Sequence, residues 1–181
     1  MSPHQPSLPQ APSKRFPTWL IVLVSIGAFV FFVIPVCSVL AVYGVRKYLA
    51  NAKRAEAQNA LAEIARDAAA AYAQNGALCP SASHPVPSSL TFVHGVKYQS
   101  ARADWEVDRP RNAGFACLQF ALSEPQYFQY SYASSPDGTF AATAHGDLNG
   151  DGNVSTFVLR GAVKGGEVVI EPRIEESDPL E

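Results

Sequence analysis

The sequence predicts an α+β fold in which a long N-terminal helix, transmembrane and then extending outward, packs on a small antiparallel β-sheet. Three observations predict this fold. An uncharged apolar run extends from Trp19 to Tyr43, and an alanine-rich run without proline continues it to Tyr72. Short alternating segments separated by turn residues follow in the C-terminal half. With 181 residues, the chain has room for one domain and an anchor.

The overall composition argues against nucleic acid as a partner. The formal net charge is -2 and the pI is near 6.1. Proteins that wrap nucleic acid need a basic surface to neutralise phosphates, and this composition supplies none. We therefore expect no nucleic acid partner.

Residues 1–17 are expected to form a disordered tail. Five prolines interrupt this segment among serine and glutamine, so backbone donors are missing and there is almost no apolar surface to bury. These prolines are Pro3, Pro6, Pro9, Pro12 and Pro17.

Residues 18–44 are predicted to form a transmembrane helix. A helix needs about 20 residues to cross about 30 Å of hydrocarbon, and the run from Trp19 to Tyr43 exceeds this length. The aromatic residues at its two ends suit the membrane–water interface, and Pro35 predicts a kink. One alternative is a buried core helix, which would need a shell that the remaining chain can scarcely supply. A cleaved secretory signal is the other, and its apolar region would be shorter.

Two features point to opposite orientations of this helix. Basic residues are fewer before the apolar run than after it, so the positive-inside rule would place the C-terminal domain in the cytoplasm. They are Lys14 and Arg15 on one side and Arg46, Lys47, Lys53 and Arg54 on the other. The cysteines argue the reverse, because Cys79 and Cys117 form an isolated pair outside the apolar run that contains Cys37. A disulfide between Cys79 and Cys117 would require an oxidising compartment.

Residues 45–76 are predicted to continue the helix beyond the membrane. Strong helix formers dominate this segment, and Asn75-Gly76 supplies a left-handed stop signal. One apolar stripe recurs at helical spacing, and most charged side chains fall elsewhere. The stripe consists of Leu61, Ile64, Ala65, Ala68 and Tyr72.

Residues 77–172 are predicted to form an antiparallel sheet domain covered by that stripe. The segments with strand character are Phe115–Leu122, Tyr127–Ala133, Gly138–Ala144, Val154–Leu159 and Val168–Glu171. Cys79, just past the helix, and Cys117, in a predicted strand, could link the helix end to the sheet. Residues 173–181 are expected to be a solvated acidic tail.

A Ca²⁺ site is one interpretation of the turn at residues 147–153. Oxygen-bearing side chains alternate here, at Asp147, Asn149, Asp151 and Asn153, as in a calcium-binding loop. The twelfth position of such a loop is Val158 rather than a bidentate glutamate. A plain hairpin turn rich in Asx residues is the alternative interpretation.

No pattern of catalytic residues is found, and we expect no enzyme activity. His84, His94 and His145 are widely spaced and lack metal-binding companions, so we assign them to surface or turn positions. No nucleophile elbow, phosphate loop or dinucleotide fingerprint is present. A further group of aromatic residues could line a binding face or pack within the sheet: Tyr127, Phe128, Tyr130 and Tyr132.

Two segments resemble the type IV pilin and pseudopilin superfamily. The first is 47–61, with an Ala-Lys-x-x-Glu-Ala core at 52–57. The second runs from Phe140 to Gly152, includes Gly-Asp-Leu-Asn-Gly-Asp-Gly, and is followed by the strand-like residues 155–159. Their order along the chain, after an apolar segment, is similar to that of pilin-like proteins.

The resemblance implies a single-pass protein of a bacterial inner membrane, with its N-terminus cytoplasmic and its domain periplasmic or extracellular. It also implies pilin-like subunits or pilus or secretion assembly proteins as partners. Residues 14–19 lack the glycine and glutamate of a prepilin peptidase site, and Ile26 stands where the glutamate would be. We therefore expect the tail and full span to be retained. The favoured function is structural or accessory, in a type IV pilus or type II secretion system; a tethered periplasmic binding module that never polymerises is the alternative.

Overall fold

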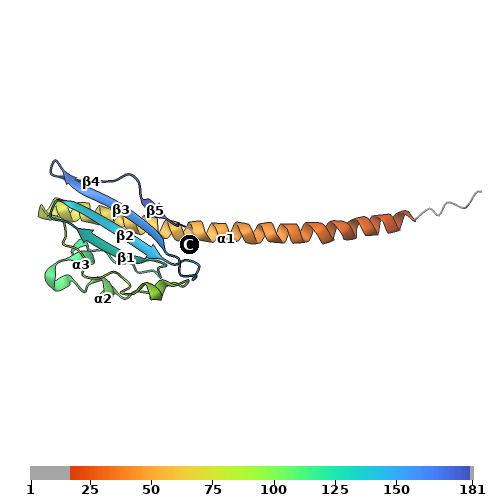
Figure 1. Cartoon of the computed structure of the whole chain (residues 1–181), viewed down its shortest axis with the longest axis horizontal. Helices are drawn as coiled ribbons and strands as arrows, with labels where there is room; N and C mark the ends of the chain where they lie inside the picture. Colours follow the sequence, from red (N-terminus) through yellow and green to blue (C-terminus); the bar gives the residue numbers. More distant parts are fainter. Residues whose placement is uncertain (1–16, 180–181) are drawn as a thin grey trace, which may run out of the picture. The chain divides into compact units, whose positions relative to one another are not determined.

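The computed structural model describes residues 17–179, so the predicted disordered tail lies almost entirely outside the described residues. The described chain is α+β, as expected, with one long helix and a five-stranded antiparallel sheet (Figure 1). It divides into two compact units, residues 1–46 and residues 47–181. The second unit contains the sheet domain.

Helix α1 (Thr18–Asn75) covers both of the helical segments that the sequence predicts. The stop signal is confirmed, because Gly76 takes a left-handed φ of +71° and donates its backbone N–H to the Tyr72 carbonyl at 2.8 Å. Pro35 lies within the helix and has no N–H to donate to the preceding turn. Helix α1 therefore continues through Pro35.

Short helical turns connect α1 to the sheet. They are η1 (Leu90–Val93), α2 (Arg102–Trp105), η2 (Arg109–Arg111) and α3 (Gly114–Leu118). The prediction of a strand at Phe115–Leu122 is wrong. Phe115 and Leu118 are spaced by one helical turn and are both buried, and Gln119 closes the turn at φ +60°. Cys117 therefore lies in α3 and not in a strand.

The sheet has the order β1-β2-β3-β4, with β5 paired to β3. Its strands are β1 (Gln129–Ser134), β2 (Thr139–Gly146), β3 (Ser155–Lys164), β4 (Glu167–Ile170) and β5 (Glu175–Ser177). Strands β1 to β4 match four of the predicted segments, with ends that shift by a few residues. All pairs are antiparallel, as expected for a hairpin meander.

Strand β5 corrects the expectation of a solvated acidic tail. Glu175–Ser177 pair with Val158–Thr156 of β3, so this part of residues 173–181 belongs to the sheet. The Glu176 side chain reaches α1, where it forms an ion pair with Arg54 and accepts a hydrogen bond from Gln58 Nε2 at 2.7 Å. The sequence predicts a solvated carboxylate at Glu176, but this group contacts two residues of α1, which is far away in the sequence.

The core of the second unit lies between α1 and the sheet. The predicted stripe is confirmed, because Leu61, Ile64, Ala65 and Ala68 are fully buried and Tyr72 is partly buried. Aromatic side chains from the sheet pack against these mostly small helix residues: Phe128, Tyr130, Tyr132, Phe140 and Phe157. Phe128, Tyr130 and Tyr132 are buried, so these three members of the predicted aromatic cluster serve packing, whereas Tyr127 is only partly buried.

The predicted cysteine pair forms a disulfide. Cys79 and Cys117 are joined with Cα atoms 5.8 Å apart, linking the segment after α1 to α3. The third cysteine, Cys37, is exposed on α1. The domain is thus covalently closed beside the end of its core helix.

Candidate functional site

The N-terminal part of α1 presents exposed apolar side chains. It is long and apolar enough to cross a membrane, and none of its most apolar stretch of 18 residues is buried. Phe31 and Phe32 illustrate this, at 72% and 68% exposure. The hydroxyl groups of its two serines do not need water, because Ser25 and Ser38 each donate to the carbonyl four residues earlier at 2.8 Å. Such a surface is suited to lipid or to other apolar helices.

Polar side chains of α1 attach the helix to the sheet domain. Within the Ala-Lys-x-x-Glu-Ala core, Lys53 Nζ donates to the Leu148 carbonyl at 2.5 Å, and Glu56 Oε1 accepts from the Tyr127 backbone N–H at 2.6 Å. Arg54 pairs with Glu176. These three side chains are thus used within the chain, a role that the sequence analysis did not anticipate. Their position on either side of the apolar stripe was the available signal.

The environment of Glu56 favours its neutral form. Burial raises the pKa of the Glu56 carboxyl, while the Tyr127 N–H and the charges of Lys97 and Lys53 oppose that shift. Both ammonium groups lie over the Tyr127 ring, at 4.4 Å for Lys53 and 4.9 Å for Lys97 from its centroid. Two cations and one carboxyl group therefore surround the residues that precede β1.

The turn at 147–153 is built around the buried carboxylate of Asp147. Its Oδ1 accepts from the Gly150 N–H at 2.7 Å, and its Oδ2 accepts from the Gly152 N–H at 2.9 Å. His94 Nδ1 lies 2.5 Å from the same Oδ2. Farther along, Asn149 Oδ1 accepts from the Asp151 N–H at 2.9 Å, and Asp151 Oδ1 accepts from the Asn153 N–H at 2.8 Å. These contacts form consecutive Asx turns.

This donor set does not fit Ca²⁺ well. Both carboxylate oxygens of Asp147 are directed at backbone N–H groups, and the neighbouring His94 offers a nitrogen, which hard cations rarely use. Residues 17–179 contain no group of three or more His, Cys, Asp or Glu side chains that could hold a metal ion. Calcium binding through Asp147, Asn149, Asp151 and Asn153 stays a prediction, and no chemistry is derived from it.

The three histidines of the domain lie apart. His84 hydrogen-bonds Ser83 at 2.8 Å in an irregular segment, and His94 contacts the Asp147 turn. The assignment of His145 to the surface or a turn is wrong, because it lies half-buried in β2 beside Thr156 of β3, with Nδ1 and Oγ1 3.0 Å apart. Burial lowers the pKa of the His145 imidazole.

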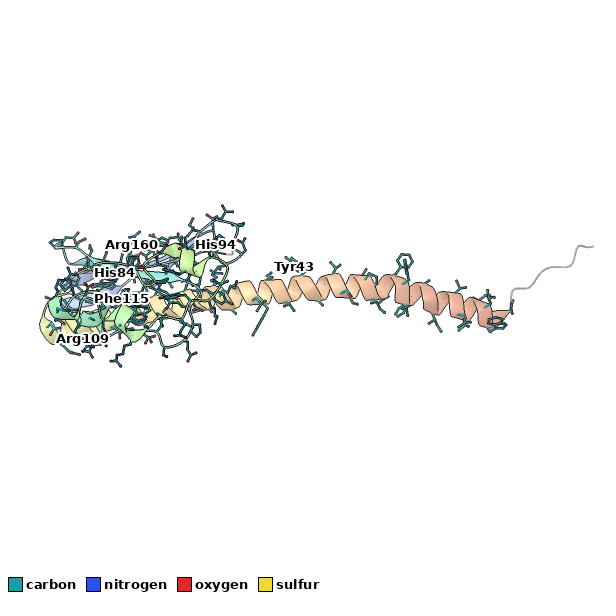
Figure 2. All side chains as sticks on the ribbon, turned by 90° about the horizontal axis from the view of Figure 1, so that it is seen from below. Tyr43, His84, His94, Arg109, Phe115 and Arg160 are labelled. Atoms are coloured by element: carbon teal, nitrogen blue, oxygen red, sulfur yellow. A yellow bond between two sulfur atoms is a disulfide. The ribbon has the colours of Figure 1, made fainter. Side chains whose placement is uncertain are left out.

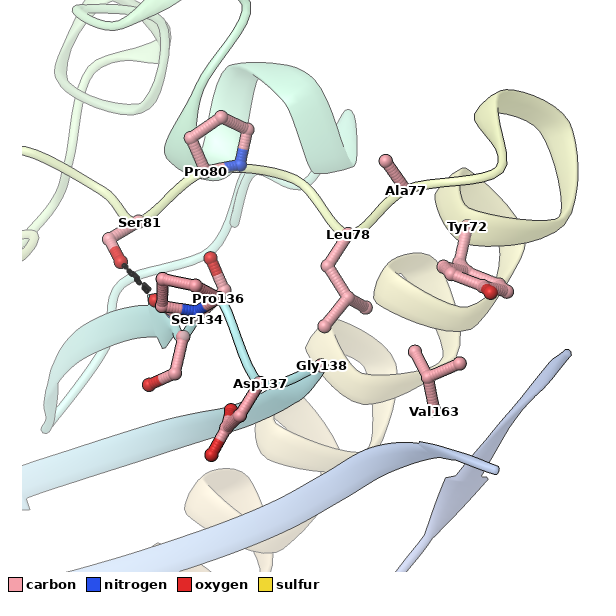
Figure 3. Close-up of a pocket in the computed structure, with 11 residues that line it drawn as sticks. Tyr72, Ala77, Leu78, Pro80, Ser81, Ser134, Pro136, Asp137, Gly138 and Val163 are labelled. Atoms are coloured by element: carbon pink, nitrogen blue, oxygen red, sulfur yellow. Dashed lines mark hydrogen bonds between the residues drawn. The ribbon is translucent and has the colours of Figure 1, made fainter. Parts of the chain in front are cut away.

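An open depression of about 710 Å³ lies where α1 ends, and Figure 3 shows its walls. Tyr72, Leu78 and Val163 supply apolar surface. Ser81 Oγ donates to the Ser134 carbonyl at 3.1 Å, and Asp137 accepts from both the N–H and the hydroxyl of Thr139. The polar groups of Ser81, Ser134 and Asp137 are thus engaged at the β1–β2 turn. No histidine is among the described lining residues.

Together these features define a class: a disulfide-closed α+β domain whose core helix also carries an exposed apolar segment long enough for a membrane. Comparison with known proteins adds no family, because no family model, no curated protein and no solved structure matches this chain.

Proposed function

We propose that this protein is a non-enzymatic, membrane-anchored subunit that assembles with pilin-like proteins. It acts as a structural or accessory component of a type IV pilus or type II secretion system in a bacterial inner membrane, with the disulfide-closed domain outside the cytoplasm. It assembles through the exposed apolar segment of α1.

One observation carries this proposal: α1 is a single helix whose apolar side chains are exposed in its first half and buried against a sheet in its second. Exposed apolar surface on this scale needs lipid or other helices as its environment. The disulfide between Cys79 and Cys117 supports an external domain, because such bonds persist in oxidising compartments.

The two segments that resemble pilin-like proteins contact each other in the domain. Lys53, in the first segment, donates to the carbonyl of Leu148, in the second. This contact ties the hairpin turn to the helix close to the point where the helix enters the domain. It supports the interpretation of the two segments as parts of one helix-and-cap unit.

The proposal is tested by photocrosslinking in the native membrane. A photoreactive amino acid replaces Phe31 in the apolar segment, and Val169, an exposed residue of β4, serves as the control position. We expect Phe31 adducts with copies of this chain or with other proteins that carry a pilin-like N-terminal helix, identified by mass spectrometry. If the Phe31 position forms adducts with lipid alone, assembly is contradicted and the apolar segment serves only to anchor the protein.

The tethered module is the second candidate, and Ile26 favours it. This side chain is apolar and 54% exposed at the position where the resembling family has a carboxylate. An Ile26→Glu variant with a restored Gly-Phe site separates the candidates. If pilus incorporation requires this variant, the native protein is the tethered module; if the native chain is incorporated as well, it is a subunit.

A further inference from the structure

Strands β4 and β5 lie one after the other along the same edge of β3 (Figure 1). Strand β4 pairs with Gly161–Lys164, and β5 pairs with Thr156–Val158. On its other side, β3 pairs with β2 over the whole of Ser155–Ala162. Separation of β5 from β3 would therefore leave the pairing of the other four strands in place.

The connection between β4 and β5 is longer than a continuous strand needs. Glu171 donates its N–H to the Arg160 carbonyl at 2.9 Å, and β5 begins opposite Val158. Residues 172–174 therefore stand opposite the single residue Leu159 and form a bulge at the sheet edge. The first of these residues is a proline, which has no N–H to donate to β3. Short connections of this kind act as hinges when two copies of a chain exchange an element, and we call residues 172–174 the hinge.

Charged and polar side chains hold β5 on both faces of the sheet. On the helix side, Glu176 pairs with Arg54 and accepts a hydrogen bond from Gln58 Nε2 at 2.7 Å. Successive side chains of a strand point to opposite faces, so Glu175 lies on the outer side. There its Oε2 accepts from Nη2 of Arg160 at 2.9 Å, and Figure 2 shows Arg160 at the surface of the domain.

The packing between the hinge and α1 is open. Ile174 is the hinge side chain that packs against the hydrophobic core, and it is only partly buried. A depression of about 900 Å³ is lined by Arg54 and Gln58 of α1 and by residues 171–176 and Pro179. Little apolar surface therefore opposes separation of β5, and the exposed ion pairs that hold it are weakened by water and salt.

Any strand that replaces β5 on the edge of β3 must match the charges beside that edge. It needs carboxylates on two successive residues, because one must reach Arg54 and Gln58 on the helix side and the other must reach Arg160 on the outer side. Strand β5 of a second copy meets this requirement, because it would form in the other copy the contacts that it forms in its own. A reciprocal exchange therefore keeps the contacts of both strands.

We propose that two copies of this chain exchange β5, each donating Glu175–Ser177 to the β3 edge of the other. The partner of this edge is thus a second copy, and the hinge is the segment that changes direction. The contacts involved all lie in the second unit. The inference goes beyond the proposed assembly through α1, because it joins two copies through their sheet domains.

The test is crosslinking between two differently tagged full-length chains that are produced in the same bacterial cells and purified in detergent. One chain carries Thr156→Cys and the other carries Ser177→Cys, at positions that are register partners in β3 and β5. The matched control combines Thr143→Cys and Val158→Cys chains, whose positions are register partners in β2 and β3. All chains also carry Cys37→Ser, and a short thiol-specific crosslinker is added after purification.

We expect the Thr156→Cys and Ser177→Cys chains to give at least about fivefold more crosslinked heterodimer than the control chains. Equal amounts from the two combinations would overturn the exchange, because association through α1 alone would bring both pairs of chains together. Absence of heterodimer would also overturn it, and crosslinking within a single chain that carries both Thr156→Cys and Ser177→Cys would then show that β5 stays in its own chain.

The photocrosslinks at Phe31 separate this inference from the proposed function. If Phe31 forms protein adducts but the heterodimer is absent, the exchange is overturned and assembly through α1 stands. If the heterodimer forms but Phe31 gives lipid adducts alone, the exchange is supported and assembly through α1 is contradicted.

Discussion

Glu56 of α1 accepts a hydrogen bond from the backbone N–H of Tyr127 at 2.6 Å, across a separation of 71 residues in the sequence. The contact joins the core helix to the segment that leads into β1. The carboxyl group is largely buried, so this bond is made at the cost of desolvation.

Glu56→Gln is expected to change how stability depends on pH. Because burial raises the folded-state pKa of Glu56 above its unfolded value, the native state holds more protons here, and the free energy of unfolding falls as pH rises from about 4.5 through the raised pKa. Glutamine keeps an acceptor for Tyr127 and removes this titration. Denaturant unfolding in detergent at a series of pH values should show a smaller decline with rising pH for the variant.

Glu63→Gln is the matched control, because Glu63 is exposed on the same helix. It should retain the decline in stability that the raised pKa of Glu56 produces. Glu56→Ala, which leaves the Tyr127 N–H without its acceptor, should lower the free energy of unfolding by about 1–2 kcal/mol at neutral pH. A pH profile of Glu56→Gln that matches the unmodified protein would show that the carboxyl group titrates normally.

Asp147→Ala is expected to destabilise the domain by roughly 2–4 kcal/mol, because two backbone N–H groups and His94 lose a charged acceptor. Thermal unfolding measured with EDTA and then with excess CaCl₂ checks both the size of the loss and the calcium prediction. We expect the same midpoint for the native protein in both buffers. A Ca²⁺-dependent rise in the native protein that Asp147→Ala abolishes would establish the metal site.

Removal of the disulfide is expected to cost about 4 kcal/mol in the chain-entropy model, given the 38-residue separation of Cys79 and Cys117. Unfolding of a Cys79→Ala/Cys117→Ala variant measures this loss, and Cys37→Ala is the control for the thiol outside the domain. In intact cells, only Cys37 should be free of a disulfide. Alkylation of Cys79 and Cys117 without prior reduction would contradict an oxidising compartment.

Gly161→Ala is expected to destabilise the sheet by about 1–3 kcal/mol through overpacking. Phe140 of β2 lies directly opposite Gly161 of β3, and a Cβ at Gly161 would stand 2.3 Å from the Phe140 ring. Combining Gly161→Ala with Phe140→Leu tests the cause, because relief of the clash makes the two losses less than additive. Additive losses in denaturant unfolding would place the cost elsewhere.

Much of the helix and the hairpins could be predicted from sequence, because their signals are local. The apolar stripe of α1 follows a helical period that Leu61, Ile64 and Ala68 satisfy, and Gly76 ends the helix as its lack of a side chain suggests. Strands β2 and β3 flank a turn rich in Asp, Asn and Gly, which is a strong hairpin signal.

The errors arose where tertiary contacts decide the structure. Phe115 and Leu118 fit either a short strand or one helical turn, and burial against Trp105, with ring centroids of Trp105 and Phe115 4.9 Å apart, selects the turn. Glu176 reads as part of an acidic end because its partners, Arg54 and Gln58, lie far away in the sequence. No local pattern encodes such a pairing.

The link between Arg54 and Glu176 also bears on the order of events during biogenesis. Arg54 lies near the start of the sheet domain, and Glu176 is contributed by its last strand. The chain must therefore be synthesised at least as far as Ser177 before the domain can close. Until then, β3 keeps an unpaired edge at Thr156–Val158, to which the strand of another chain could pair.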